Sequence, residues 1–144
     1  MVTDNAPERG AALDGKATVL FVCLHGSAKS LIAAEYLNVL ARERGIPLRG
    51  ESSGVEPDAS VPAPVVTGLA EEGIDVRAYV PQAVTTERLA SAAQIVSFGC
   101  DLSNMIPRGR PVEQWDDLPL VSDGYATARA AIVARVAMLL DRVG

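Results

Sequence analysis

The residues of this sequence that could do chemistry are concentrated in one short loop, Cys23-Leu24-His25-Gly26-Ser27-Ala28-Lys29-Ser30. Gly26, Ser27 and Ala28 are small, so backbone N–H groups could close around an anion without interference from side chains. The loop leads into a helical pattern, and the positive end of a helix favours both a bound oxyanion and a cysteine thiolate. The pattern predicts a site for a tetrahedral oxyanion, with the Cys23 thiol at its base.

Three side chains of the loop could assist the thiol. Lys29 adds a positive charge that helps both a thiolate and an oxyanion. Ser30 is expected to cap the helix and to direct its hydroxyl at the sulfur. His25, the one histidine of the chain, could contact the oxyanion or the thiolate, or could shape the rim of the loop. The residues expected to bind the oxyanion are Leu24, His25, Gly26, Ser27, Ala28 and Lys29.

The elements that must hold this loop alternate between strand and helix, which is typical of an α/β sheet. Apolar runs predict strands at 18–23, 48–53 and 94–99, and a brief strand within 107–112. Helical patterns cover about 30–44, from 62 or 64 to 72, 86–93 and 125–143. We therefore expect a single three-layer α/β domain, with about four parallel strands and helices on both faces. Ligands of such sheets bind beyond the carboxyl ends of the strands, where Cys23 and Cys100 both lie.

Composition excludes several other classes of protein. The chain has 144 residues, 49% of them hydrophobic, and a formal net charge of −5, which disfavours a nucleic-acid surface. No apolar run is long enough to span a bilayer. Residues 1–16 are polar and are expected to form a flexible tail before a domain over 17–144, in a cytoplasmic protein. Two cysteines are too few for a disulfide scaffold, and no bound metal or cofactor is expected.

The loop Cys23–Ser30 resembles the Cys-x5-Arg-Ser loop of the low-molecular-weight protein tyrosine phosphatases, and most closely that of their arsenate reductase branch. The similarity extends over nearly the whole chain from Thr18 onward. Ser52–Val55 resembles the Ser-Ala-Gly segment after the second strand. The segment Gln94–Asp101 resembles the strand that ends in a second cysteine in arsenate reductases, and Trp115–Pro119 resembles the loop that bears the catalytic acid.

This resemblance implies a covalent mechanism. The Cys23 thiolate would attack phosphorus or arsenic, while loop amides and a cation hold the oxyanion. An aspartic acid of the late loop would protonate the leaving oxygen; Asp117 is the first candidate and Asp116 the second, and a solvated acidic turn is the alternative. In the arsenate branch a second thiol, from Cys100 or from an external reductant, would attack the arsenic adduct and release arsenite.

The sequence departs from the family pattern in three ways. Lys29 replaces arginine, so the bidentate guanidinium becomes a point charge; loss of one oriented oxyanion contact commonly costs about 3–4 kcal/mol. Gly26 replaces an asparagine that braces the loop. Leu118 separates Asp117 from Pro119, whereas the family has aspartate directly before proline.

Three functions remain open from the sequence. Arsenate reduction with a thiol reductant ranks first because of the Cys-x-His start of the loop and the position of Cys100. Hydrolysis of phosphomonoesters ranks second, because the late loop lacks an aromatic residue to flank a phosphotyrosine ring. An oxyanion-binding module with weakened turnover is the third. No third cysteine follows Cys100, so either a Cys23–Cys100 disulfide or an external thiol would have to complete a reductive cycle.

Overall fold

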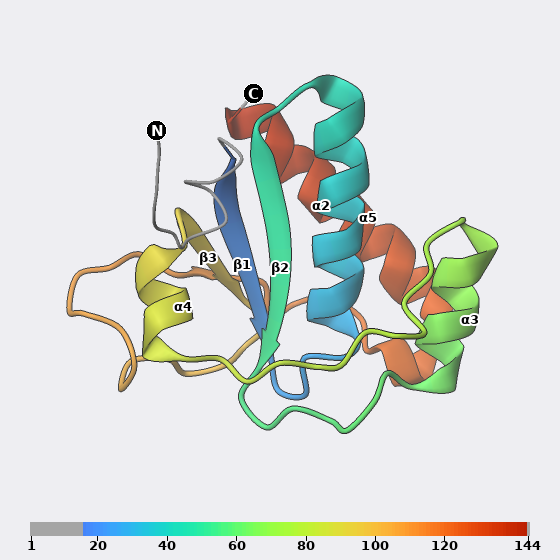
Figure 1. The fold of residues 1–144 in the computed structure, drawn as a ribbon, viewed down its shortest axis with the longest axis horizontal. Coiled ribbons are helices and arrows are strands. Elements are labelled where there is room, and N and C mark those ends of the chain that lie inside the picture. Colours follow the sequence, from blue (N-terminus) through green and yellow to red (C-terminus); the bar gives the residue numbers. More distant parts are fainter. Residues whose placement is uncertain (1–15, 144) are drawn as a thin grey trace.

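The structure is a computed structural model that describes residues 16–143. Its centre is a parallel sheet of four strands in the order β2-β1-β3-β4, shown in Figure 1. The strands are β1 (Ala17–Cys23), β2 (Leu48–Gly54), β3 (Gln94–Ser97) and β4 (Glu113–Gln114). The number of strands and their parallel arrangement confirm the fold class expected from the sequence. Strand β2, the least apolar of the three long strands, lies at an edge of the sheet.

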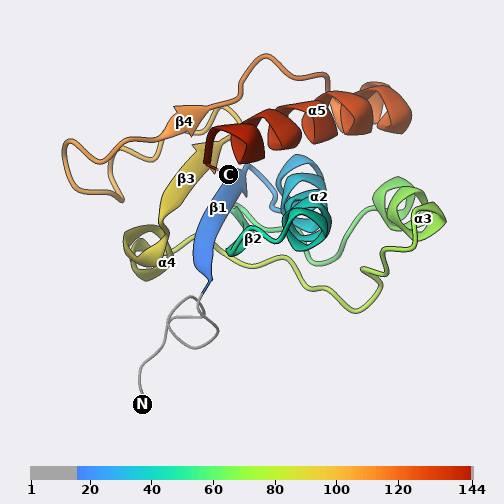
Figure 2. The ribbon, with the colours of Figure 1, turned by 90° about the horizontal axis from the view of Figure 1, so that it is seen from above.

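Helices cover both faces of the sheet, as Figure 2 shows from above. On one face, α2 packs against α5, and α3 lies beside them; on the other face α4 packs near β1. The helices are α2 (Lys29–Arg44), α3 (Ala63–Glu71), α4 (Thr86–Ser91) and α5 (Tyr125–Val143), and a 3-10 turn, η1 (Val121–Asp123), precedes α5.

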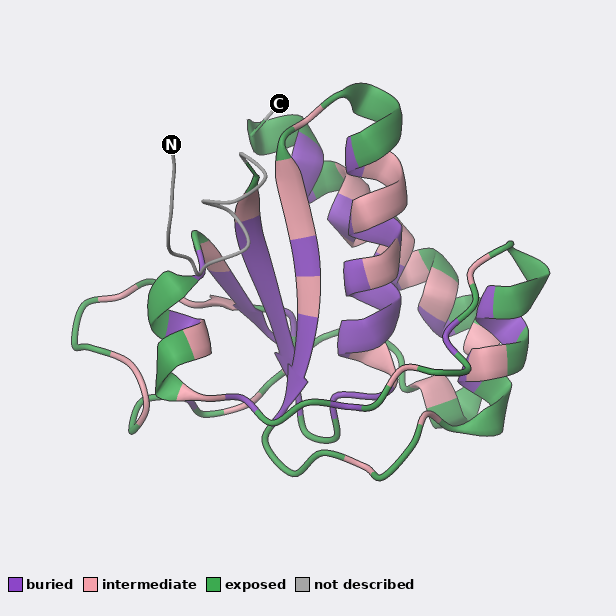
Figure 3. Cartoon of the chain, in the orientation of Figure 1, coloured by how far each residue is buried: buried purple, intermediate pink, exposed green. Residues whose placement is uncertain are grey.

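Strand β1 divides the core into two clusters because its side chains alternate between the faces. Val19 and Phe21 belong to the cluster under α2 and α5. Leu20 and Val22 belong to the smaller cluster under α4. All four are at most 1% exposed, and β1 is the most continuously buried strand in Figure 3. A strand buried on both faces gives a rigid base for the loop that follows it.

Three expectations about the elements need correction. Ser30 does not cap α2; the cap position is Ala28, whose side chain makes no capping hydrogen bond, and the helix already begins at Lys29. The fourth strand lies at Glu113–Gln114 instead of within 107–112. Strand β3 ends at Ser97 because Gly99, at φ +84°, turns the chain away. The tail expected over 1–16 lies outside the described residues, except for Lys16.

Candidate active site

Cys23 ends β1, the inner strand between β2 and β3, and pairs with Gly54 across the sheet. It is 8% exposed and lines a cavity of about 510 Å³ beyond the carboxyl ends of the strands. The cavity is also lined by Leu24, His25, Ser27, Ala28, Lys29, Asp58, Pro62, Pro64, Val65, Phe98, Leu120, Val121 and Ser122. The structure thus brings most of the expected oxyanion-binding residues to one cavity together with the thiol.

The Cys23 sulfur has two hydrogen-bonding neighbours within its own loop. The backbone N–H of Gly26 donates to Sγ at 3.1 Å, and the Ser30 hydroxyl oxygen lies 2.9 Å from Sγ. Ser30 Oγ lies a further 2.7 Å from Ser52 Oγ, which in turn donates to the Gly26 carbonyl at 3.3 Å.

This chain of hydroxyls can serve both protonation states of the sulfur, because each hydroxyl has one proton and can rotate. When Cys23 is a thiol, it donates to Ser30, Ser30 donates to Ser52, and Ser52 donates to the Gly26 carbonyl. When Cys23 is a thiolate, the first two bonds reverse, and Ser52 donates to Ser30, which donates to the sulfur. Ionisation therefore leaves the sulfur hydrogen-bonded without moving a heavy atom.

Gly26 allows the loop to approach β2 very closely. Its φ is +63°, in the left-handed region that favours glycine, and a Cβ there would lie 2.7 Å from the backbone nitrogen of Gly54. A Cβ on Gly54 would in turn lie 2.6 Å from the carbonyl carbon of His25. Two glycines thus face each other where the backbones meet, and the asparagine of the family pattern is replaced by direct backbone packing.

The N-terminus of α2 faces the cavity without a competing cap. Since Ala28 supplies no side-chain acceptor, the first amides of this 16-residue helix remain available to an anion. Lys29 lines the cavity and is half-buried, and none of the carboxylates in residues 16–143 pairs with its ammonium group. Helix amides and Lys29 together give the cavity floor a positive potential.

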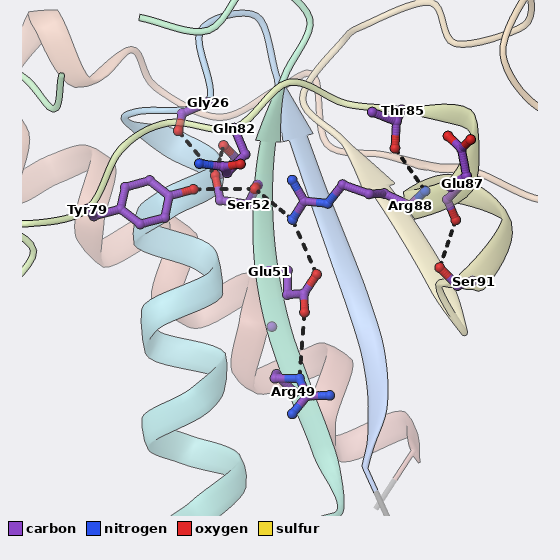
Figure 4. Close-up of polar contacts among 12 residues, drawn as sticks. Gly26, Arg49, Glu51, Ser52, Tyr79, Gln82, Thr85, Glu87, Arg88 and Ser91 are labelled. Carbon is purple, nitrogen blue, oxygen red and sulfur yellow. Dashed lines mark hydrogen bonds and ion pairs between the residues drawn. The ribbon is translucent and has the colours of Figure 1, made fainter. Parts of the chain in front are cut away.

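The carboxyl end of β2 is also held by side chains from outside the Cys23–Ser30 loop (Figure 4). The hydroxyl of Tyr79 and the guanidinium of Arg88 both donate to the Ser52 carbonyl, each at 3.4 Å. Arg88 also pairs with Glu51 at 3.2 Å, and Glu51 lies 3.6 Å from Arg49. These contacts hold the Ser52 backbone in place, and therefore its hydroxyl beside Ser30.

The walls of the cavity are largely apolar. Phe98, directly after β3, stacks edge-on against the buried Trp115, with ring centroids 5.7 Å apart. Trp115 is therefore a core residue that supports the wall. Leu120 and Val121, around the start of η1, also line the cavity. The sequence did not indicate Phe98 as a wall residue, because it belongs to an apolar run typical of a buried strand.

The expected catalytic acids do not line the cavity. Asp117 pairs with Arg135 of α5 at 3.1 Å, and its side chain is 68% exposed. The Arg135 guanidinium holds the pKa of the Asp117 carboxyl below its usual range. Asp116 is exposed, and its Cβ lies beside Gly99. A solvated acidic turn, the alternative given by the sequence, describes both residues as the structure places them.

Cys100 also lies outside the cavity lining. Its side chain packs against the cluster under α4, together with Met105 and Ile106. Cys23 follows Val19 and Phe21 in the alternation of β1, and those two side chains belong to the cluster under α2 and α5. Burial raises the pKa of the Cys100 thiol, and the charge of the Cys23 sulfur raises it further. Both cysteines are free thiols.

Asp58 is a cavity residue that the sequence did not single out, because it lies in a stretch noted only for its turn-forming residues. Its carboxylate accepts a hydrogen bond of 2.6 Å from the Ser27 hydroxyl and lies 3.5 Å from Nδ1 of His25. Nδ1 also lies 3.1 Å from the Glu56 carbonyl. Two acceptors at the same nitrogen indicate that Nδ1 carries a hydrogen.

Within residues 16–143 no group of three or more His, Cys, Asp or Glu side chains is placed to hold a metal ion. None of the helices in that part of the chain combines the length and apolar character needed to cross a membrane.

A parallel α/β sheet with a cysteine-containing loop between its first strand and the following helix is the architecture of small oxyanion-handling phosphatases and arsenate reductases. The sequence model of the low molecular weight phosphotyrosine protein phosphatases matches residues 18–113, and the chain belongs to this family. No curated protein matches the sequence.

Solved structures agree with this assignment. YfkJ from Bacillus subtilis is similar at a TM-score of 0.78 and 18% identity, covering 89% of this chain and 94% of that one. An arsenate reductase from Archaeoglobus fulgidus is similar at a TM-score of 0.69 and 28% identity, covering 85% and 98%. A low molecular weight protein tyrosine phosphatase from T. tengcongensis is similar at 0.68 and 18% identity, covering 88% and 99%. Both activities of the family are thus represented among similar folds.

Proposed function

We propose that this protein hydrolyses phosphomonoesters with an apolar organic group, through a covalent phosphocysteine at Cys23. The observation that carries the proposal is the cavity of about 510 Å³ with apolar walls above the thiol. Pockets for small organic ligands commonly measure about 300–1,000 Å³, whereas a free oxyanion needs only the loop itself. Phe98 and Leu120, which both line the cavity, could contact an aromatic or aliphatic group.

The chemistry follows from the contacts of the sulfur. The thiolate of Cys23, hydrogen-bonded by Ser30 and the Gly26 amide, attacks phosphorus, and the ester oxygen leaves. Loop amides, the first amides of α2 and Lys29 stabilise the charge on the remaining phosphoryl oxygens. Water then cleaves the phosphocysteine, which releases phosphate and restores the thiolate.

Arsenate reduction is the second candidate, and it is favoured by the 28% identity to the Archaeoglobus fulgidus arsenate reductase. In this case Cys23 forms the adduct with arsenate, and a thiol supplies the electrons that release arsenite. Because the Cys100 side chain packs on the opposite face of the sheet, we propose an external thiol reductant for this route.

A parallel assay of the purified protein and of Cys23→Ser separates the candidates. One arm uses p-nitrophenyl phosphate, and the other uses arsenate with thioredoxin or glutathione. We expect hydrolysis of the phosphate ester by the native protein only, and little arsenite. Arsenite formation without ester hydrolysis would favour the second candidate. If neither substrate is turned over above the Cys23→Ser level, both enzymatic proposals fail and an oxyanion-binding module stands.

A further inference from the structure

Asp58 is the single carboxylate among the described residues that line the cavity over Cys23. We propose that Asp58, in the segment between β2 and α3, is the catalytic acid that protonates the leaving oxygen. This inference rests on the proposed function and adds the proton donor to it. The donor comes from the segment between β2 and α3, whereas the sequence indicates the loop Trp115–Pro119.

The backbone beside Asp58 is attached directly to the catalytic loop. The amide of Glu56 donates to the Leu24 carbonyl at 2.7 Å, and the amide of Asp58 donates to the His25 carbonyl at 3.1 Å. The segment therefore runs alongside the loop that begins at Cys23, and the Asp58 carboxyl group is held at the cavity wall. Its side chain is 38% exposed, so a proton can be exchanged with solvent.

The neighbours of Asp58 suit a carboxyl group that gains and loses a proton. The Ser27 hydroxyl, 2.6 Å away, can donate to the carboxylate or accept from the carboxylic acid. Nδ1 of His25 lies 3.5 Å from the Asp58 carboxylate. Among the described residues that line the cavity, the charged or titratable side chains other than Asp58 are Cys23, His25 and Lys29. The His25 and Lys29 side chains thus line the same cavity as the Asp58 carboxyl group.

The segment from Trp115 to the start of α5 offers no competing acid inside the cavity. It contributes Leu120, Val121 and Ser122 to the lining, and Asp117 is paired with Arg135 outside it. A low pKa also makes Asp117 a poor proton donor at neutral pH.

The proposed step balances in atoms and charge. As the bond from phosphorus to the ester oxygen breaks and the bond to the Cys23 sulfur forms, protonated Asp58 gives its proton to the departing oxygen. The Asp58 carboxylate then takes a proton from the water that attacks the phosphocysteine. This second step returns the carboxylic acid and the thiolate and releases phosphate.

The test is the dependence of the rate on the leaving group in Asp58→Asn. Asparagine keeps the shape of the side chain and can still accept from Ser27, but it cannot donate an acidic proton. General acid catalysis contributes about 10²–10⁴-fold. We expect kcat/KM for phenyl phosphate, a poor leaving group, to fall by about 100-fold or more. For 2,4-dinitrophenyl phosphate, whose leaving group needs no protonation, kcat/KM should fall by less than about tenfold. Asp75→Asn, in an exposed pair with Arg77, is the matched control and should match the native protein.

Four results would overturn the proposal. An equal loss on both substrates would make Asp58 a structural residue of the loop. A leaving-group-dependent loss in Asp116→Asn or Asp117→Asn, with Asp58→Asn behaving like the native protein, would return the role to the late loop. If the native protein cleaves neither substrate above the Cys23→Ser level, the proposed function itself fails. If the native protein cleaves both substrates and Asp58→Asn does so equally well, the proposed function stands and only the role of Asp58 as the acid is refuted.

Discussion

The hydroxyl oxygen of Ser30, in the first turn of α2, lies 2.9 Å from the sulfur of Cys23, the last residue of β1. Ser30 can serve the sulfur because it is not the cap of α2. It lies one residue inside the helix and is fully buried, so its hydroxyl points back along the loop. The sequence predicts both a helix cap and a hydroxyl directed at the sulfur for Ser30; the structure has the second without the first, and this hydroxyl supplies the side-chain hydrogen bond that a thiolate at this position needs.

Removal of this hydroxyl should slow the reaction of Cys23 with electrophiles. A hydrogen bond to a charged group is worth about 1.5–3 kcal/mol, so Ser30→Ala should lower the alkylation rate of Cys23 by iodoacetamide at neutral pH about tenfold or more. The rate is followed on the Cys23 peptide by mass spectrometry, with Ser103→Ala, an exposed serine, as the control. An unchanged rate in Ser30→Ala would show that the hydroxyl does not stabilise the thiolate.

Lys29→Arg should raise the turnover of p-nitrophenyl phosphate. A guanidinium can donate two parallel hydrogen bonds to two phosphoryl oxygens, whereas an ammonium group acts as a point charge. One oriented contact is worth about a hundredfold to a thousandfold, so partial recovery should give an increase of about tenfold. Lys16→Arg, at the only other lysine of the chain, should have no effect. An equal or lower rate in Lys29→Arg would count against Lys29 as the residue that holds the oxyanion.

Gly26→Ala should destabilise the protein more than Gly73→Ala. Both glycines have a positive φ, +63° at Gly26 and +82° at Gly73. Alanine at either position must adopt the left-handed backbone conformation, which lowers the free energy of unfolding by about 1–2 kcal/mol. Only at Gly26 would the new Cβ also meet backbone atoms of Gly54, and such overpacking adds about 1–3 kcal/mol. Urea unfolding measures the difference in the free energy of unfolding. Equal values for the two variants would refute the close approach of the two backbones.

Cys100 should react slowly and should not form a disulfide with Cys23. Burial raises the pKa of its thiol, so the reactive thiolate forms at higher pH than in free cysteine. In Cys23→Ser the alkylation rate of Cys100 should therefore reach half its maximum at a higher pH than that of N-acetylcysteine. A non-reducing peptide map of the native protein after mild oxidation with diamide should contain no Cys23–Cys100 peptide; its appearance would revive an internal redox role.

The strands and the loop were predictable because their signals are local. The apolar run before Cys23 predicts a buried strand, and the small residues after it predict a tight turn. The helix that ends at Gly45 was also recognisable, since Gly45 adopts the left-handed conformation that terminates α2. These features depend on neighbours in sequence and needed no knowledge of tertiary contacts.

The residues that complete the cavity could not be predicted in this way. Asp58 and Ser27 are 31 positions apart, and their contact exists only because the segment after β2 pairs with the catalytic loop. Asp117 lies in a segment whose sequence resembles an acid-bearing loop, yet Arg135, 18 positions later, holds it outside the cavity. Cys100 lies near the correct end of the sheet, but its side chain packs on the other face.

The central claim is that Cys23 carries the phosphoryl group during turnover. Its most direct test is rapid acid quenching of the native protein with p-nitrophenyl phosphate, followed by intact and peptide mass spectrometry. We expect a mass increase of one phosphoryl group that maps to the Cys23 peptide and is absent from Cys23→Ser. Steady hydrolysis by the native protein with no phosphorylated Cys23 peptide at any quench time, or equal hydrolysis by Cys23→Ser, would contradict the claim.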